Sequence, residues 1–290
     1  MRIGIDLGGT KIEALAIDDR GREMYRQRVA APRDDYHATI DAIVALVAEI
    51  EARTGRQGRV GVGTPGAVSP ATGLMKNCNS TWLNGQPLAR DLEAALRRPV
   101  RMANDANCFA LSEAIDGAAA GAPVVFGVIL GTGVGAGLVI DRKALTGPNA
   151  IAGEWGHNPL PWPRDDERPG PACWCGKHGC IESFLSGPAV ERLHLERTGR
   201  RVAASEIEDS GIWADYIDRL ARALAHVINI IDPDMIVLGG GLSNRVALYQ
   251  PVADRLNDHV FSDYVSTVIR QPVFGDASGV RGAAWLWPES

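Results

Sequence analysis

The sequence predicts an α/β fold made of two similar halves that face each other across a cleft. Two observations carry this prediction. Strand-like runs alternate with amphipathic helices along the 290 residues, and a unit of strand, glycine-rich turn and strand occurs near residue 7 and again near residue 132. Alternating strands and helices are typical of α/β domains. The recurring hairpin indicates a duplication in which each half contributes one glycine turn.

The first half begins with a hairpin. Two strand-like runs, Arg2–Asp6 and Lys11–Ile17, flank a glycine turn. A long helix follows over Tyr36–Thr54, because apolar residues recur there every three or four positions and Gly55 marks its end. The remaining elements of this half are expected in the order strand 60–63, helix 88–96, strand 100–103 and helix 107–119.

The second half repeats the hairpin, with strands expected over Val124–Leu130 and Ala136–Ile140. Pro159–Ala172 is rich in proline and charge, which predicts an exposed loop. A long helix is expected over 213–231, then a strand over 235–238 that leads into three glycines, and a short closing helix near 279–286.

The composition is that of a soluble globular protein, with 46% hydrophobic and 22% charged residues. A formal net charge of −5 gives no reason to expect nucleic acid or an anionic membrane as a partner. No apolar run approaches the ~20 residues of a membrane-spanning helix, and the start of the chain lacks the pattern of a signal peptide. Five cysteines, three of them clustered, are too few for a secreted disulfide framework. We therefore expect a cytoplasmic protein.

The first glycine turn is a candidate phosphate site. Asp6 ends a strand just before Gly8, Gly9, Thr10 and Lys11. Residues without a Cβ let backbone N–H groups approach a phosphate, and the threonine hydroxyl and lysine ammonium add donors. The aspartate can hold Mg²⁺ directly or through water. Taken alone, the motif is equally well explained by an aspartate that ends a strand above a tight turn.

The second turn, residues 131–136, satisfies the dinucleotide-binding pattern G-x-G-x-x-A. That pattern has meaning only where the turn opens a helix, and residues 137–140 predict a strand, so the dinucleotide interpretation fails. No G-x-x-x-x-G-K-[ST] sequence occurs, which excludes a P-loop. The glycines at 239–241 are a third place where backbone can approach a nucleotide.

Three cysteines, Cys173, Cys175 and Cys180, lie within eight residues, among glycines that permit tight turns. His157 can complete a tetrahedral Cys₃His set, and His178 is a competing fourth ligand. A redox pair is the alternative, but the spacing is C-x-C rather than C-x-x-C. Four protein ligands leave no open position, so we predict structural rather than catalytic zinc.

Two glutamates flank this cysteine loop. Glu154 lies three residues before His157, and Glu182 lies two residues after Cys180. Folding the loop around a metal would bring both carboxylates to one wall, where they could bind neighbouring hydroxyls of a sugar. A solvated surface position is the usual alternative for a glutamate. In the functional interpretation the zinc braces the groups that contact the substrate.

Asp105 is the candidate general base. It lies where a strand ends and a helix begins, and the spacing alone favours the ordinary role of an aspartate there, which is to cap the helix. The functional interpretation is that Asp105 accepts the proton of a sugar hydroxyl as it attacks the γ-phosphate. Phosphoryl transfer needs mainly positioning and charge neutralisation, together with one such base and Mg²⁺.

The motifs together resemble the ROK family of repressors and sugar kinases. In order along essentially the whole chain they are Asp6-x-Gly-Gly-Thr-Lys, Gly63-Thr-Pro-Gly, Asn104-Asp-Ala-Asn, Leu130-Gly-Thr-Gly, Gly153-Glu-x-Gly-His and Cys173-x-Cys-Gly-x-x-Gly-Cys-x-Glu. The resemblance implies the two-lobed, actin-like (ribonuclease H-like) ATPase fold, ATP with Mg²⁺, and a homodimer. The lobes would be residues 1–117, closed by the C-terminal helix 276–290, and residues 118–275 with the zinc-binding loop.

The resemblance also implies roles for individual residues. The base falls on Asp105, the sugar ligands on Asn104, Glu154, His157 and Glu182, and the zinc ligands on His157, Cys173, Cys175 and Cys180. The ATP phosphates are implied to bind at Asp6, Gly8, Gly9, Thr10, Lys11, Thr132, Gly133, Val134 and Gly135, with Gly239 and Gly240 near the nucleotide. One ring nitrogen of His157 would then face zinc and the other the sugar.

Within the family, Lys76–Gly85, Glu154–Trp162 and Asp276–Trp285 look like the bacterial fructokinase branch, which makes fructose 6-phosphate from D-fructose and ATP. Cys78 departs from the small apolar residue expected in that branch. Mannose, glucose and N-acetylglucosamine kinases of the same family are the alternatives.

Two functions without turnover compete with the kinase hypothesis. A sugar-responsive repressor carries a helix-turn-helix domain ahead of the kinase-like part, but here the first strand is expected from Arg2, and the chain is not basic. A sugar-binding module without catalysis is the second, and the presence of Asp105 argues against it. We therefore expect an ATP:hexose 6-phosphotransferase, with fructose as the leading substrate.

Overall fold

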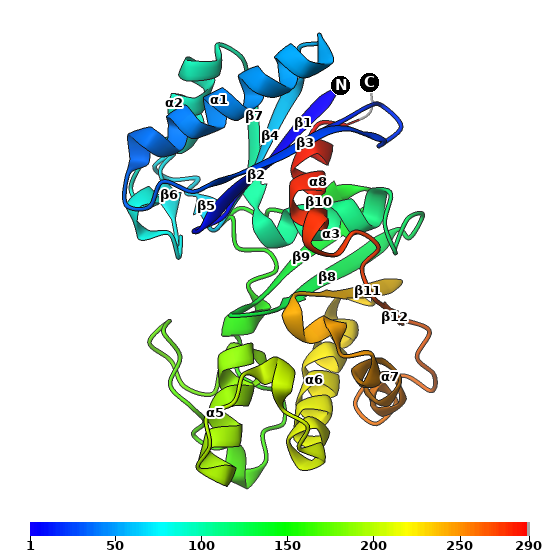
Figure 1. The fold of residues 1–290 in the computed structure, drawn as a ribbon. Helices are drawn as coiled ribbons and strands as arrows, with labels where there is room; N and C mark the ends of the chain where they lie inside the picture. The colour runs from blue at the N-terminus through cyan, green and yellow to red at the C-terminus, as the bar shows by residue number, and fades with distance from the viewer. Residues whose placement is uncertain (289–290) are drawn as a thin grey trace.

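The computed structural model describes residues 1–288 and contains two five-stranded mixed sheets, one above the other in Figure 1. The strand order is β3-β2-β1-β4-β7 in the first sheet and β10-β9-β8-β11-β12 in the second, and β5 and β6 form a separate ribbon. The expected α/β class and the repeat of a hairpin in each half are confirmed.

The first sheet combines parallel and antiparallel strands. Its strands are β1 (Arg2–Leu7), β2 (Lys11–Ile17), β3 (Glu23–Ala30), β4 (Arg59–Thr64) and β7 (Val100–Asn104), and the ribbon is β5 (Ala67–Val68) with β6 (Met75–Lys76). β1, β4 and β7 are parallel, whereas β2 and β3 run antiparallel to their neighbours. The helices α1 (Tyr36–Thr54) and α2 (Leu88–Leu96) cover its outer face (Figure 1).

The second sheet has a similar plan. Its strands are β8 (Val124–Leu130), β9 (Val134–Ile140), β10 (Lys143–Ala144), β11 (Met235–Gly239) and β12 (Val268–Arg270). β8, β11 and β12 are parallel, and β9 returns antiparallel to β8. Four helices that follow β10 in the chain pack into the hydrophobic core of this sheet: α4 (Glu182–Leu185), α5 (Gly187–Thr198), α6 (Ser210–Ile231) and α7 (Tyr249–Leu256). Seven short 3₁₀ turns complete the described residues: 81–83, 155–157, 165–167, 204–206, 241–244, 246–248 and 275–277.

Two helices, α3 (Asp105–Ile115) and α8 (Ser278–Trp285), lie between the sheets and pack against each other (Figure 1). Glycines in the strands permit the close approach. A Cβ on Gly61 of β4 would lie 1.9 Å from the Ala283 carbonyl of α8, and one on Gly137 of β9 would lie 2.5 Å from the Ala106 carbonyl of α3. Thus α8 closes the first sheet and α3 supports the second.

Several expectations need correction. The predicted helix 107–119 begins two residues earlier and ends at Ile115, and β3, α5, α7 and β12 were not predicted. Segment 159–172 is not simply an exposed loop, because Glu167 within it is 3% exposed. Helix α8 occupies 278–285 of the segment 276–290, of which residues 289–290 lie outside the described part. Within residues 1–288 no helix is long and apolar enough to cross a membrane.

Candidate active site

The carboxyl ends of the parallel strands bring the candidate residues of the first sheet together. Asp6 pairs with Gly63 near the end of β1, and Thr64 pairs with Asn104 at the ends of β4 and β7. Asp105 follows at once as the first residue of α3. Ligands of open α/β sheets bind outside the carboxyl ends of the strands, so the candidate base and the candidate Mg²⁺ ligand lie where a site is expected.

Asp105 does not cap helix α3. Asn104 is the cap, since its side-chain Oδ1 accepts a hydrogen bond of 2.8 Å from the Asn107 N–H. Asp105 Oδ1 accepts one from the adjacent Ala106 N–H at 2.8 Å, and its side chain stays accessible to solvent. The capping interpretation, which the spacing alone favoured, is therefore wrong, and the structure leaves the Asp105 carboxylate available for chemistry.

Carboxylates of this region perturb one another. Protein surrounds Asp105 closely enough that burial raises its pKa despite its access to solvent, and the charge of Glu154 raises it further. Burial raises the pKa of Asp6 to about 6, with the charges of Asp105 and Glu13 acting in the same direction. A cation beside Asp6 would relieve this repulsion, and carboxylate oxygens are the ligands that a hard ion such as Mg²⁺ prefers.

Two predicted sugar ligands line one small pocket. Asn104 of β7 and Glu154, which precedes the 3₁₀ turn 155–157, border a cavity of about 90 Å³ together with Thr64 and Thr146. Asn107 also lines it and is 7% exposed, and its side-chain Oδ1 is buried without a hydrogen-bond partner among the described residues. Buried polar atoms are usually paired, so this oxygen indicates a place for a ligand group or a water.

The glycine turns expose their tips. In the first, the Gly8 N–H donates to the Lys11 carbonyl at 3.0 Å, and Thr10 at the tip is exposed. In the second, the Gly131 N–H donates to the Gly133 carbonyl at 3.0 Å, and Thr132 is exposed. Each turn is closed by a backbone hydrogen bond while its threonine remains reachable, as a phosphate-binding turn requires.

The third glycine segment has a packing explanation. A Cβ on Gly239 would lie 2.5 Å from the ring of Phe109, and one on Gly240, whose φ is +83°, would lie 2.4 Å from the Leu130 carbonyl. Leu130 is the last residue of β8, so the segment does lie beside the second turn, which begins at Gly131. The need for glycine at these two positions is met without invoking a nucleotide.

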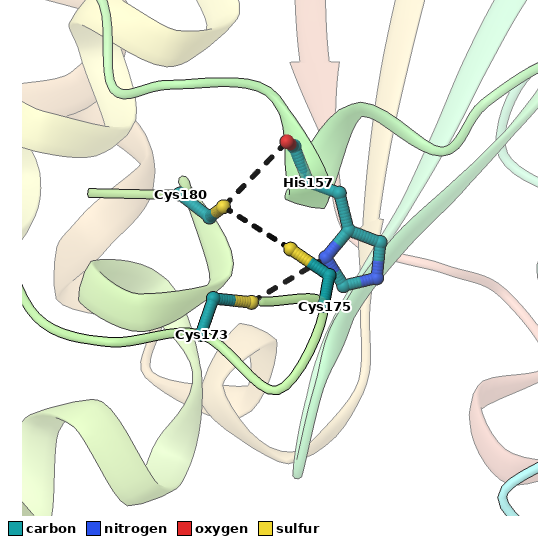
Figure 2. A group of neighbouring side chains, drawn as sticks. All are labelled: His157, Cys173, Cys175 and Cys180. Atoms are coloured by element: carbon teal, nitrogen blue, oxygen red, sulfur yellow. Dashed lines mark hydrogen bonds between the residues drawn. The ribbon is translucent and has the colours of Figure 1, made fainter. Parts of the chain in front are cut away.

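The predicted zinc ligands converge. Figure 2 shows the side chains of His157, Cys173, Cys175 and Cys180, whose donor atoms all lie within 4.8 Å of one another. His157 Nδ1 lies 3.6 Å from Cys173 Sγ, and the sulfurs of Cys175 and Cys180 are 3.7 Å apart. A tetrahedron with Zn–S of about 2.3 Å and Zn–N of about 2.0 Å has S–S edges of about 3.8 Å and S–N edges of about 3.5 Å. The four residues therefore fit zinc.

The structure supports neither His178 as the fourth ligand nor the redox alternative. His178 is exposed and is not part of the four-residue group. All five cysteines are free thiols. Gly176 and Gly179 have φ of +87° and +70°, values that favour glycine and that let the loop turn back on itself around the sulfurs.

A buried ion-pair network holds the segment before the cysteines. Glu167 accepts hydrogen bonds from Arg219 at 2.7 Å and from Arg222 at 2.9 and 3.0 Å, both on α6. Burial alone would raise the pKa of Glu167, but the hydrogen bonds from Arg222 and Arg219 lower it to about 2. This ion pair is hard to predict from the sequence, because the partners of Glu167 lie more than fifty positions away.

Glu182 connects the second glycine turn to the cysteine loop. Its Oε2 accepts a hydrogen bond of 2.9 Å from the Val134 N–H, and its Oε1 accepts one of 2.6 Å from Trp174 Nε1. A Cβ on Gly133 would lie 2.8 Å from Oε2, so the carboxylate lies directly against the backbone of the turn. Sequence reasoning missed Trp174, although a tryptophan between two predicted metal ligands was a visible signal.

Comparison with known proteins decides the family. The sequence profile described as the ROK family matches residues 2–290. This chain belongs to the ROK family. It is 43% identical over 300 residues to the N-acetyl-D-glucosamine kinase of Escherichia coli O139:H28, with 99% of each chain covered. The expectation of a ROK family sugar kinase is thereby confirmed.

Solved structures of ROK proteins share the fold. The ROK hexokinase from Thermus thermophilus superposes with a TM-score of 0.87 at 29% identity, over 98% of this chain and 97% of that one. The ROK family glucokinase from Streptomyces griseus, solved with glucose and AMPPNP, gives 0.79 at 26% identity, over 100% and 99%. The actin-like ATPase fold is confirmed, whereas none of these relatives supports the fructokinase branch.

Proposed function

We propose that this ROK protein transfers the γ-phosphoryl group of ATP to the 6-hydroxyl of N-acetyl-D-glucosamine, with Asp105 as the general base. The observation that carries the proposal is the Asp105 carboxylate, which is released from helix capping by Asn104 and lies at the carboxyl edge of the first sheet. The charge of Glu154, which lines the small pocket together with Asn104, raises the pKa of Asp105 and supports this proposal.

In this mechanism Asp105 accepts the proton of the sugar hydroxyl while the hydroxyl oxygen attacks the γ-phosphorus and ADP leaves. A raised pKa suits this role, because a base works best when its pKa approaches the working pH. Asn104 and Glu154 hold ring hydroxyls so that the reacting oxygen faces the phosphate. Positioning of this kind supplies much of the acceleration in phosphoryl transfer.

The two glycine turns would receive the phosphates of ATP, with Thr10 and Lys11 contributing donors from the first and Thr132 from the second. Asp6 would hold Mg²⁺, which supplies neutralisation of the phosphate charge. The zinc would be structural, since His157 and three cysteines fill a tetrahedron, and it would fix the loop that carries Glu182. The lobe boundaries near residues 117 and 275, and a homodimer, stay predictions.

The choice of sugar rests on the whole chain rather than on short segments. Fructose was favoured by three local stretches, including Lys76–Gly85, but identity of 43% to an N-acetyl-D-glucosamine kinase extends over 99% of the chain. The structural relatives are named as a hexokinase and a glucokinase, so related scaffolds accept different hexoses. We therefore favour N-acetyl-D-glucosamine and place fructose second.

The test is ADP release with ATP and Mg²⁺ across N-acetylglucosamine, glucose, mannose and fructose, compared as kcat/KM. We expect N-acetylglucosamine to lead by at least about tenfold, which corresponds to about 1.4 kcal/mol of differential transition-state binding. If fructose leads, the substrate assignment is wrong and the local segments were the better guide. If no sugar is phosphorylated, the kinase proposal itself fails.

A further inference from the structure

Trp174 lies between two of the cysteines of the zinc loop, and its side chain is 74% exposed. An exposed apolar side chain is common and by itself assigns no function. Trp174 differs because it touches two of the residues, His157 and Glu182, that the family resemblance implies as sugar ligands. Its Nε1–H donates a hydrogen bond of 2.6 Å to Glu182 Oε1, and its ring meets the His157 ring edge to face with centroids 4.9 Å apart.

These contacts fix the Glu182 carboxylate from two sides. The Val134 N–H holds Oε2 at 2.9 Å, and the Trp174 indole N–H holds Oε1. Each oxygen of a carboxylate can accept about two hydrogen bonds. Oε1 also accepts a weak one from Cys173 Sγ at 4.0 Å, so Oε2 is the oxygen that keeps a position for a sugar hydroxyl. A carboxylate held in this way loses little rotamer freedom when the sugar binds, which favours affinity.

The rest of the indole remains uncovered beside His157 and Glu182. The backbone of Trp174 is positioned by its neighbours Cys173 and Cys175, which the metal would hold in place. A large rigid aromatic surface next to hydroxyl-binding groups suits a ligand that combines hydroxyls with an apolar substituent. The N-acetyl methyl group of the proposed substrate is such a substituent, and unsubstituted hexoses lack it.

We propose that Trp174 is a positioning and specificity-determining residue, which orients Glu182 through its indole N–H and covers the acetamido group with its ring. This inference rests on the proposed function and names the part of the site that distinguishes N-acetylglucosamine from glucose. The indole N–H would orient Glu182, and the face of the ring would cover the acetamido group. Substitutions can therefore separate them.

Trp174→Phe keeps a ring and removes the N–H, whereas Trp174→Ala removes both. With Trp174→Phe we expect KM to rise about fivefold to tenfold for N-acetylglucosamine and glucose alike, with kcat within about twofold, since one hydrogen bond to a charged group is lost. With Trp174→Ala we also expect the ratio of kcat/KM for N-acetylglucosamine to that for glucose to fall about tenfold, whereas Trp174→Phe should leave this ratio unchanged. Trp162→Phe is the matched control, because Trp162 is also exposed but contacts His226 and His259 instead.

A double-mutant cycle tests the route through Glu182. If Trp174 acts through that carboxylate, Trp174→Phe adds no further rise in KM to Glu182→Gln. Additive effects would overturn the inference, and so would a loss of zinc from Trp174→Phe, because the residue would then act through the metal loop. If wild-type protein phosphorylates N-acetylglucosamine and both Trp174 variants match it, only the inference falls. If wild-type protein does not use that sugar, the proposed function falls first.

Discussion

We expect the ionised Asp6 carboxylate to lower the free energy of unfolding, a cost that comes with its role at the site. Burial and the charges of Asp105 and Glu13 raise its pKa from 3.8 to about 6. One pKa unit is worth about 1.36 kcal/mol, so the ionised carboxylate costs the folded state up to about 3 kcal/mol. Because the folded pKa is the higher one, the folded protein binds the proton more readily, and the cost is present in full above about pH 6. It fades as the pH falls from about 6 to 3.8.

Asp6→Asn should therefore stabilise the protein at pH 8 by up to about 3 kcal/mol and should gain little near pH 4. The same change removes the proposed Mg²⁺ ligand, so turnover should fall by at least about a hundredfold. Stability is measured by urea unfolding at several pH values without nucleotide or metal, as a shift of midpoint at constant slope. Asp258→Asn, at an exposed site after α7, is the control.

An Asp6→Asn protein that is no more stable than wild type at pH 8 would contradict the electrostatic argument. A gain of the same size at pH 4 and pH 8 would also contradict it, because the cost of the charge disappears once both folded and unfolded chains are protonated. Full activity of the variant would remove Asp6 from the proposed Mg²⁺ site.

Three further predictions concern the loop and the sheets. Cys175→Ser should lower the zinc content of the purified protein, as measured by metal analysis, and should lower the melting temperature; unchanged zinc stoichiometry would reject this ligand. Glu167→Ala should destabilise by about 3–5 kcal/mol in urea unfolding, since it removes the carboxylate that pairs with the buried Arg219 and with Arg222, of which Arg222 keeps Asp218, and an effect under 1 kcal/mol would argue against the network. In wild type the contribution of Glu167 should be complete above pH 4.5 and decline as the pH falls through about 2. Gly61→Ala should cost about 3 kcal/mol or more, because its Cβ would lie 1.9 Å from the Ala283 carbonyl, and normal stability would mean that α8 can move away.

Features encoded by neighbouring residues could be predicted from the sequence. Helix 36–54 was predicted with both of its ends from its apolar periodicity and Gly55. In the structure Asp35 caps its start, and Gly55, at φ +65°, ends it. The hairpin strand 11–17 was also predicted with its bounds. The cysteines of the candidate zinc site could be named because all three lie within eight residues and glycines limit how the loop can turn. In each case the deciding interactions are local.

Features decided by distant or competing contacts could not be predicted from the sequence. Asn104 and Asp105 are both good helix caps, and only the backbone conformation shows that Asn104 takes the role. Glu167 lies in a segment that was predicted to be an exposed loop, and only the fold brings it within hydrogen-bond distance of two arginines of α6. Strand β3 was missed because it is an edge strand rich in charge, where Arg26 and Arg28 pair with the buried Glu13 of β2.

The most direct test of the central claim compares catalysis with binding in Asp105→Asn. Asparagine keeps the shape of the side chain but cannot accept the proton of the sugar hydroxyl at neutral pH. We expect the variant to bind N-acetylglucosamine in calorimetry within about threefold of wild type and to lose at least about a thousandfold in kcat. A variant that binds the sugar and keeps a kcat near that of wild type would contradict the claim that Asp105 is the base.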